Sequence, residues 1–291
     1  MTQSTNPLRQ FFRQPAIYLK LPSAGRYWPA ASLELPANGE LPIFPMTAID
    51  EITYRTPDAL FNGQAVISVI QSCVPAIKNA WHIPNIDLSP VLIAIRIASY
   101  GHEMNLNTTC PTCSHEEEYS VDMRTVLDQI RSPDFVKTLN YGDLEIIFKP
   151  VTYEQQNQSS IAQFEQQKIL SVLPTSDLSE EEKMARLSQS MKIITDLTIN
   201  IVGQSITAIK TSNTAVTDSA QIEEFLRNCE SKIYNQIRDH VISLRQQSEI
   251  PPLSIKCTEC NNEFNQPLDL DIANFFASAS YSLLLSKSVH M

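Results

Sequence analysis

Four of the six cysteines stand in two pairs with the same internal spacing. The first pair is Cys110 and Cys113, and the second is Cys257 and Cys260. Two residues between cysteines let one tight turn direct both sulfur atoms at a single point, as tetrahedral zinc requires. The spacing therefore predicts one zinc ion per chain, with these four thiolates as its ligands. Four thiolates leave no coordination position for water, so we expect a structural ion rather than a catalytic one.

The sequences around the two cysteine pairs are alike. Each pair follows an alternating segment and precedes an acidic–aromatic stretch, Glu118-Tyr119 in the first case and Glu263-Phe264 in the second. We interpret each as a β-hairpin with its cysteines in the turn, which is consistent with an internal duplication. The pairs are 143 residues apart, whereas a compact zinc ribbon has about 15–20 residues between them. The chain is therefore expected to leave the site, build other structure and return.

Redox exchange is the alternative interpretation of a CxxC pair. Such motifs lie between a strand and a helix N-terminus in a βαβ context, which neither pair has, so the sequence favours zinc. His102 and His115 could act as ligands, but four thiolates suffice and we expect both histidines at the surface. Cys73 and Cys229 fall on apolar faces of expected helices and are interpreted as core residues.

Proline positions and hydrophobic spacing indicate an α+β fold that is mostly helical, with short β-hairpins. Prolines break the apolar alternations near the N-terminus, which predicts short or edge strands there. We expect four parts: an extended proline-rich arm (residues 1–46), a helical segment (47–105), a discontinuous zinc-knuckle module (106–130 with 253–291), and a β-hairpin with a helical insertion (131–252).

Local signals place individual elements within these parts. Capping patterns predict helix starts at Thr47 with Asp50, at Ser179 with Glu182 and at Asp218. A cap followed by proline predicts another at Ser89 with Pro90. The run 91–101 is almost wholly apolar and predicts a buried helix. A hairpin is expected around Asn140–Asp143, a mostly helical region over 153–247, and a last helix over Asp271–Ser286.

Composition and motifs limit the function. The chain has 22 Lys+Arg against 32 Asp+Glu, a net charge of −10, so it lacks the basic surface that binds nucleic-acid backbones. It has no Walker loop, dinucleotide fingerprint, HExxH or GxSxG motif, so we do not expect an enzyme. No apolar run is long enough to span a bilayer, and no secretory leader is expected.

Three aromatic pairs are candidate anchors for partners, because buried aromatic residues carry much interface energy. For Phe11-Phe12 and Tyr27-Trp28 we favour an interface, since the surrounding arm has little core of its own. For Phe275-Phe276 the sequence leaves interface and internal core equally open.

The order of four segments resembles the baseplate-hub proteins of T-even-like contractile-tailed bacteriophages. No single segment is diagnostic, but their order and spacing are similar over about residues 17–125. The segments are LPSAGRYWP (Leu21–Pro29), PMTAIDE (Pro45–Glu51), ALFNGQAVISVIQSCV (Ala59–Val74) and NTTCPTCSHEEEYSVD (Asn107–Asp122).

The resemblance implies a non-enzymatic structural component of the phage tail baseplate, in its hub or wedge region, assembled in the host cytoplasm and carried in the virion. Its partners would be other tail proteins, reached through the N-terminal arm, with a homo-oligomer in the tail as a further possibility. One alternative is a chaperone that assembles the hub and then leaves. Another, of a different class, is a zinc-ribbon nucleic-acid binder, which would need a basic or aromatic face where the sequence has Glu116–Glu118.

Overall fold

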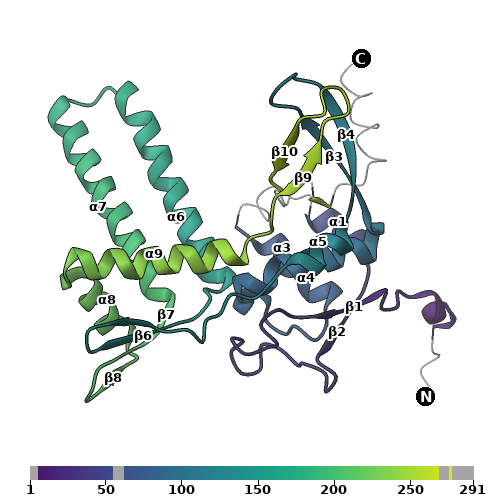
Figure 1. Cartoon of the computed structure of the whole chain (residues 1–291), viewed down its shortest axis with the longest axis horizontal. Coiled ribbons are helices and arrows are strands. Elements are labelled where there is room, and N and C mark those ends of the chain that lie inside the picture. The colour runs from purple at the N-terminus through teal and green to yellow at the C-terminus, as the bar shows by residue number, and fades with distance from the viewer. Residues whose placement is uncertain (1–5, 55–61, 269–274, 277–291) are drawn as a thin grey trace. The chain divides into compact units, whose positions relative to one another are not determined.

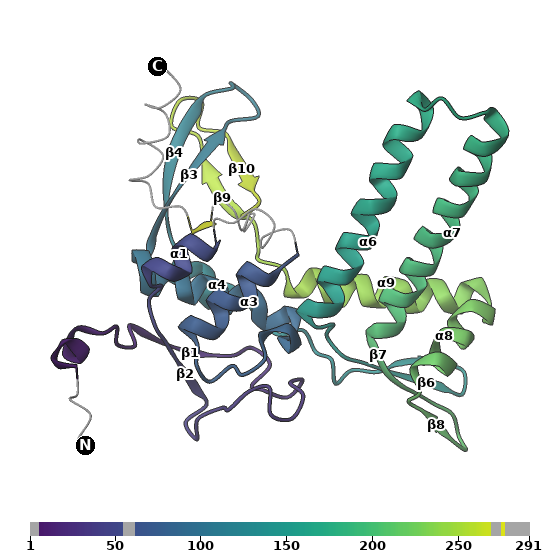
Figure 2. The ribbon, with the colours of Figure 1, turned by 180° about the vertical axis from the view of Figure 1, so that it is seen from behind.

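The computed structural model describes residues 6–54, 62–268, 275 and 276. Contacts between residues divide the chain into two compact units. Unit 1 comprises Met1–Ala80, Asp87–Ile130 and Ile250–Met291, and unit 2 comprises Trp81–Ile86 and Arg131–Glu249. Helices alternate with short antiparallel sheets in both units (Figures 1 and 2), which confirms the α+β class.

The described residues of unit 1 form three two-stranded antiparallel sheets and a small set of helices. Along the chain its elements are η1 (Pro7–Phe11), β1 (Ile17–Lys20), β2 (Glu40–Ile43), α1 (Ala48–Tyr54), α3 (Gln64–Cys73), most of α4 (Asn85–Tyr100), β3 (Glu103–Thr109), β4 (Glu116–Asp122), α5 (Met123–Gln129), β9 (Leu253–Lys256) and β10 (Glu263–Gln266). The short 3-10 turn η2 (Ala80–His82) lies where the chain first passes to unit 2.

Helix α4 is central to unit 1, as its apolar sequence predicts. All five residues from Val91 to Ile95 are buried, and so are Leu41 and Ile43 on β2. The helix begins at Asn85, however, so the start predicted at Ser89 and Pro90 is wrong, and Pro90 lies inside the helix. As the sixth residue of the helix, Pro90 lacks the N–H that would donate four residues back, but the helix continues through this position to Asn85.

Unit 2 combines a four-stranded antiparallel sheet, ordered β5-β6-β7-β8, with four helices. Its elements are β5 (Leu139–Tyr141), β6 (Leu144–Phe148), α6 (Tyr153–Val172), η3 (Leu173–Thr175), α7 (Glu180–Gln204), β7 (Ile206–Lys210), β8 (Ala215–Val216), α8 (Ser219–Asn228) and α9 (Ser231–Ser248). Antiparallel pairing of β6 with β7 carries the chain back onto the hairpin after α7.

Several local predictions for unit 2 are confirmed. The hairpin forms at Asn140–Asp143, the Ser179–Glu182 capping box starts α7, and Asp218 caps α8. The region expected to be mostly helical also contains β7 and β8, which the sequence analysis missed. The helix expected over Asp271–Ser286 falls almost wholly outside the described residues.

Candidate metal centre and the contacts of the family motifs

The four cysteines of the two CxxC pairs lie together. The sulfur atoms of Cys110 and Cys260 are 3.6 Å apart, those of Cys113 and Cys257 are 3.7 Å apart, and all four lie within 4.8 Å of one another. With zinc–sulfur bonds of about 2.3 Å, a regular tetrahedron places its sulfur atoms about 3.8 Å apart. The arrangement therefore fits a four-thiolate metal ion without rearrangement of the chain.

The two hairpin turns that carry these cysteines have the same backbone geometry. Strands β3 and β4 pair antiparallel before and after the first turn, as β9 and β10 do for the second. In the first turn, the Ser114 amide donates to the Cys110 carbonyl and the Cys110 amide donates to the His115 carbonyl; Asn261, Cys257 and Asn262 repeat both bonds in the second. Ser114 and Asn261 also share a left-handed conformation, with φ of 58° and 57°. The likeness of the two sequences is thus a likeness of structure.

Polar contacts join the two hairpins beside the cysteines. The Tyr119 hydroxyl lies 3.0 Å from the Lys256 carbonyl and 3.0 Å from the Glu117 carboxylate. The Thr258 hydroxyl donates to the same carboxylate at 2.6 Å. These contacts align the two turns by bonds that need no metal.

The surroundings of the first cysteine favour its thiolate, which is the metal-binding form. Backbone N–H groups, that of Cys113 first and then that of Thr112, lower the pKa of Cys110 to about 6. This preference is specific to Cys110, because the pKa of Cys113 and that of Cys260 are raised within the same cluster of thiols. Hydrogen bonds donated to the charged form of a group favour that form.

Among the described residues, the remaining histidines and cysteines lie outside the cluster. His115 is partly exposed, with its ring nitrogen 4.0 Å from the Glu117 carboxylate, and His102 is partly exposed as well. Cys73 is fully buried, and burial raises its pKa to about 12. The sequence predicts core positions for both cysteines. This is confirmed for Cys73, whereas Cys229 is only partly buried.

The LPSAGRYWP segment is hydrogen-bonded to the buried carboxylate of Asp87, a contact that the sequence did not predict. The Asp87 side chain is fully buried at the first turn of α4. It accepts hydrogen bonds from the Ser23 amide at 2.9 Å, the Ser23 hydroxyl at 2.5 Å and the Trp28 indole N–H at 2.8 Å. Burial raises the pKa of Asp87, opposed by these donors. The Trp28 indole N–H is thus held by the fold, but the side chain is only partly buried, so a partner contact through Tyr27-Trp28 stays a prediction.

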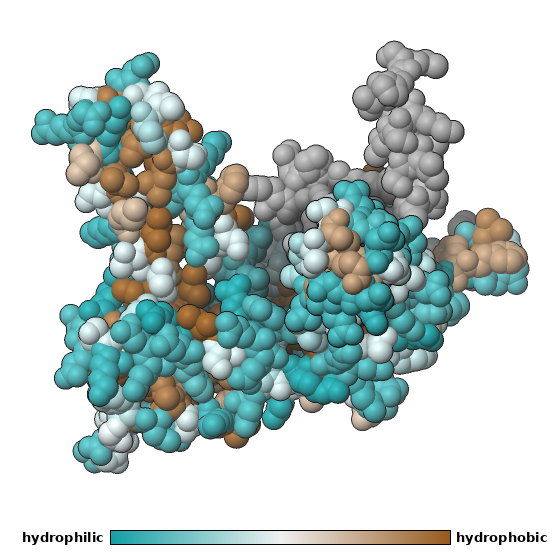
Figure 3. Space-filling model, turned by 45° about the horizontal axis from the view of Figure 1, so that its top comes forward, coloured by the Kyte–Doolittle hydropathy of each residue, from teal (hydrophilic) through white to brown (hydrophobic). Residues whose placement is uncertain are grey.

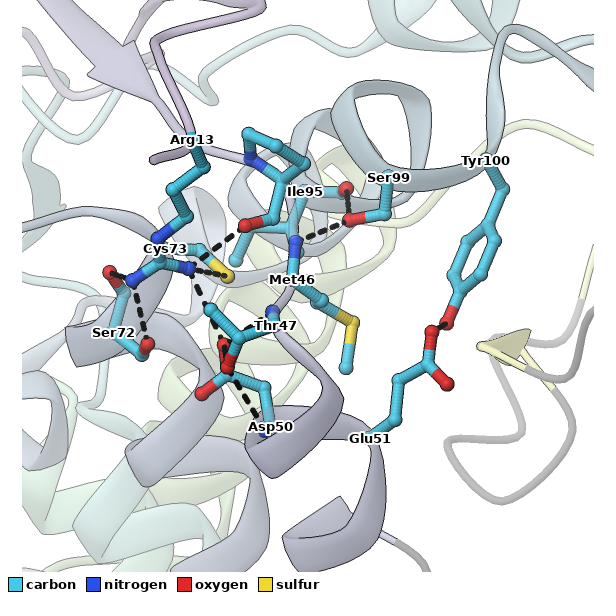
Figure 4. Close-up of polar contacts among 11 residues, drawn as sticks. Arg13, Met46, Thr47, Asp50, Glu51, Ser72, Cys73, Ile95, Ser99 and Tyr100 are labelled. Atoms are coloured by element: carbon cyan, nitrogen blue, oxygen red, sulfur yellow. Dashed lines mark hydrogen bonds and ion pairs between the residues drawn. The ribbon is translucent and has the colours of Figure 1, made fainter. Parts of the chain in front are cut away.

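The PMTAIDE segment is held in a second polar cluster, drawn in Figure 4. The Thr47 amide and hydroxyl donate to the Asp50 carboxylate at 2.7 and 2.8 Å, which caps α1 as predicted. Arg13 contacts the same carboxylate at 3.2 Å and also donates to the Pro45 carbonyl and to Ser72 on α3. Next to this cluster, the Tyr100 hydroxyl at the end of α4 donates to Glu51 at 3.0 Å.

Arg13 fixes the start of the arm, but the aromatic pair before it is not covered. The exposed fraction is 76% for Phe11 and 57% for Phe12, and Leu8 on η1 is 59% exposed.

No helix within the described residues is long and apolar enough to cross a membrane.

Comparison with known proteins gives one family. The family model described as "T4 bacteriophage base plate protein" matches residues 32–277, a span that includes both CxxC pairs, Asp87 and the whole of unit 2. No curated protein and no solved structure matches the chain. Since the match extends over most of the 291 residues, the chain belongs to the T4 bacteriophage base plate protein family.

Proposed function

We propose that this protein is a non-enzymatic structural component of a contractile phage tail baseplate, in the hub or wedge region, stabilised by one zinc ion on Cys110, Cys113, Cys257 and Cys260. The single observation that carries the zinc proposal is the cluster of four sulfur atoms within 4.8 Å. Membership of the baseplate family supports the structural role.

The ion would supply folding energy rather than chemistry. Its ligands come from two turns separated by most of unit 2 in the sequence, so binding would hold both ends of that insertion together. Because an unfolded chain has no preformed site, the free energy of metal binding becomes folding free energy. A baseplate subunit that must withstand contraction of the tail would gain mechanical strength from such a clamp.

The N-terminal arm is proposed to contact other baseplate proteins. Leu8, Phe11 and Phe12 expose large apolar side chains, and Arg13 fastens the next residues to α1 and α3. An anchored base with an exposed aromatic tip loses little conformational entropy on binding, which favours affinity. Replacement of Phe11 and Phe12 by serine should reduce incorporation into baseplates without lowering the melting temperature.

Location in the virion is tested by quantitative mass spectrometry of purified particles. A resident component gives a fixed copy number per tail that survives stringent washing. Detection only in infected-cell lysate, together with hub precursors, would contradict residence and favour an assembly chaperone that leaves before maturation.

The metal is tested on reduced, freshly purified protein by elemental analysis. We expect about one zinc per chain, as four thiolates from one chain fill one tetrahedral site. Clearly substoichiometric zinc in protein prepared without chelators would refute the metal assignment while leaving the family membership intact.

A further inference from the structure

The hairpin formed by α6 and α7 in unit 2 has little core of its own. These helices have 20 and 25 residues, but the only buried residues along them are Tyr153 and Gln166 on α6, and Ser190 and Val202 on α7. Gln166 and Ser190 are polar, and the buried side-chain amide oxygen of Gln166 has no hydrogen-bond partner within the described structure. Helices of this length normally draw their stability from burying an apolar face, and this hairpin buries very little.

Apolar side chains nevertheless follow the hairpin. Figure 3 shows them as a column along the two helices, at the left of that view. Near the end where α6 turns into α7 they line a groove of about 270 Å³. Its walls are four apolar residues, a basic residue from each helix and one serine: Ile169, Val172, Leu173, Leu178, Lys168, Arg186 and Ser176. Ile169 and Val172 are 42% and 56% exposed, so this apolar surface faces solvent in the single chain.

The charges beside the groove are of both signs. Lys168 and Arg186 line it, and Glu165 lies one helical turn before Lys168 on α6. None of these three side chains has an ion pair within 4.0 Å among the described residues. A two-fold axis crossing α6 between positions 165 and 168 would place each glutamate opposite the lysine of the other copy. Such reciprocal pairing is the property of an isologous interface.

We propose that the α6–α7 hairpin binds a second copy of this chain, with the two grooves facing each other to form a four-helix bundle. The apolar residues of each groove would supply the core that the single hairpin lacks. The reciprocal Glu165–Lys168 pairs would set the register of α6 against its counterpart. A four-helix bundle packs its helices close to antiparallel around a shared apolar core, which two such hairpins can form.

Charge complementarity favours a second copy over an unrelated partner. A partner helix that is only acidic would satisfy Lys168 and Arg186 but would repel Glu165. A small ligand would need convergent polar groups, whereas four of the seven groove residues are apolar and two of these, Ile169 and Val172, are exposed. This inference does not depend on the proposed zinc site or on location in the virion.

Sedimentation velocity of the full-length protein tests the proposal. We expect a dimer for the unmodified chain and a monomer for Val172→Asp, because the change replaces apolar surface of the shared core with a carboxylate that loses its hydration on association. Val172 is exposed in the single chain, so the variant should retain its helical circular dichroism. Met184→Asp is the matched control, since Met184 is a 65% exposed α7 residue that does not line the groove, and it should dimerise normally.

Charge reversal tests the register. Glu165→Lys alone and Lys168→Glu alone should each weaken dimerisation by about tenfold or more, because like charges then face each other. The double variant carrying both changes restores opposite charges and should recover the dimer. A monomeric unmodified chain at tens of micromolar would overturn the proposal and assign the groove to a different protein. Dimers that persist in Val172→Asp would place the interface elsewhere.

Discussion

Unit 1 and the α6–α7 hairpin of unit 2 are held together by contacts of different range. In unit 1, Asp87 binds residues 59 and 64 positions away, and Tyr119 reaches a carbonyl 137 positions away. In the hairpin, the side-chain bonds of Ser179, Thr195 and Thr198 reach only three or four positions along the helix. Unit 1 is therefore defined by tertiary contacts, and the hairpin mainly by local helix geometry, with the ion pair of Asp196 and Arg227 as a longer link from α7 to α8.

The difference in range implies a difference in cooperativity. A long-range contact closes a loop of chain, so its loss releases every segment that the loop orders. A helix cap or a helical side-chain bond affects mainly the turn in which it lies. Changes in unit 1 should thus lower global stability, while changes in the hairpin should act on local fraying or on association.

The largest effect is expected from loss of one cysteine ligand. Cys110→Ser should abolish stoichiometric zinc binding and unfold the paired hairpins, because three thiolates cannot close the structural site and metal binding is linked to folding. Elemental analysis combined with limited proteolysis between β3 and β4 measures both consequences.

A second cysteine provides the control for this experiment. Cys229→Ser removes a thiol of unit 2 that lies outside the cluster, and it should keep full zinc content. Equal zinc in Cys110→Ser and in the unmodified chain would show that the clustered sulfurs do not bind the ion.

The next largest effect is expected at Asp87. Asp87→Ala leaves the Ser23 amide, the Ser23 hydroxyl and the Trp28 indole N–H without their buried acceptor, which should cost about 2–4 kcal/mol of unfolding free energy. Urea unfolding measures this loss. Removal of the exposed carboxylate in Asp177→Ala should change stability little. Similar losses in the two variants would mean that the buried contact does not stabilise unit 1.

Local signals made part of this architecture predictable from sequence. A CxxC pair constrains its own turn, so two similar pairs were enough to predict two hairpins sharing one site. Capping boxes at Thr47–Asp50 and Ser179–Glu182 likewise fix helix starts through bonds only three residues long.

Features that depend on distant partners were not predictable in the same way. Asp87 looks like an ordinary acidic residue in the first turn of a helix, and only the fold brings Ser23 and Trp28 to it. Strand β7 has a short alternating pattern, ITAIK, but its assignment depends on pairing with β6, more than fifty residues earlier in the chain. The structural role of Arg13 could not be predicted from its neighbours in the sequence, because its partners lie on α1 and α3.

A smaller effect is expected from the cap of α7. Ser179→Ala removes the hydroxyl that accepts from the Glu182 amide, which should cost about 1 kcal/mol of helix stability. If the hairpin is held locally, amide hydrogen exchange should accelerate in the first turn of α7 and stay unchanged in unit 1. Faster exchange throughout unit 1 would contradict the local character of the hairpin contacts.

The smallest effect is expected at Asp122, which gives unit 1 a local contact like those of the hairpin. Its carboxylate caps α5 by accepting from the Arg124 amide, and it binds the Arg124 guanidinium two residues along the chain. Hydrogen bonds from the Arg124 side chain lower the pKa of Asp122 to about 2, below the value of about 3.9 in an unfolded chain. The charged form is therefore favoured by folding. Its stabilising effect is complete above about pH 4 and is lost as the pH falls toward 2.

The pH dependence of Asp122→Asn separates this contact from the other acid-sensitive groups. The variant should have a slightly lower melting temperature than the unmodified chain at pH 6, because asparagine caps the helix but cannot pair with Arg124. The difference between the two should shrink as the pH falls to about 2, where Asp122 is half protonated. Because release of the proposed zinc ion would also destabilise unit 1 in acid, the comparison is made on hydrogen exchange of the α5 amides alone. A difference that grows with acidity would have the wrong sign for a carboxylate of lowered pKa, and would show that Asp122 is not charged and paired in the folded protein.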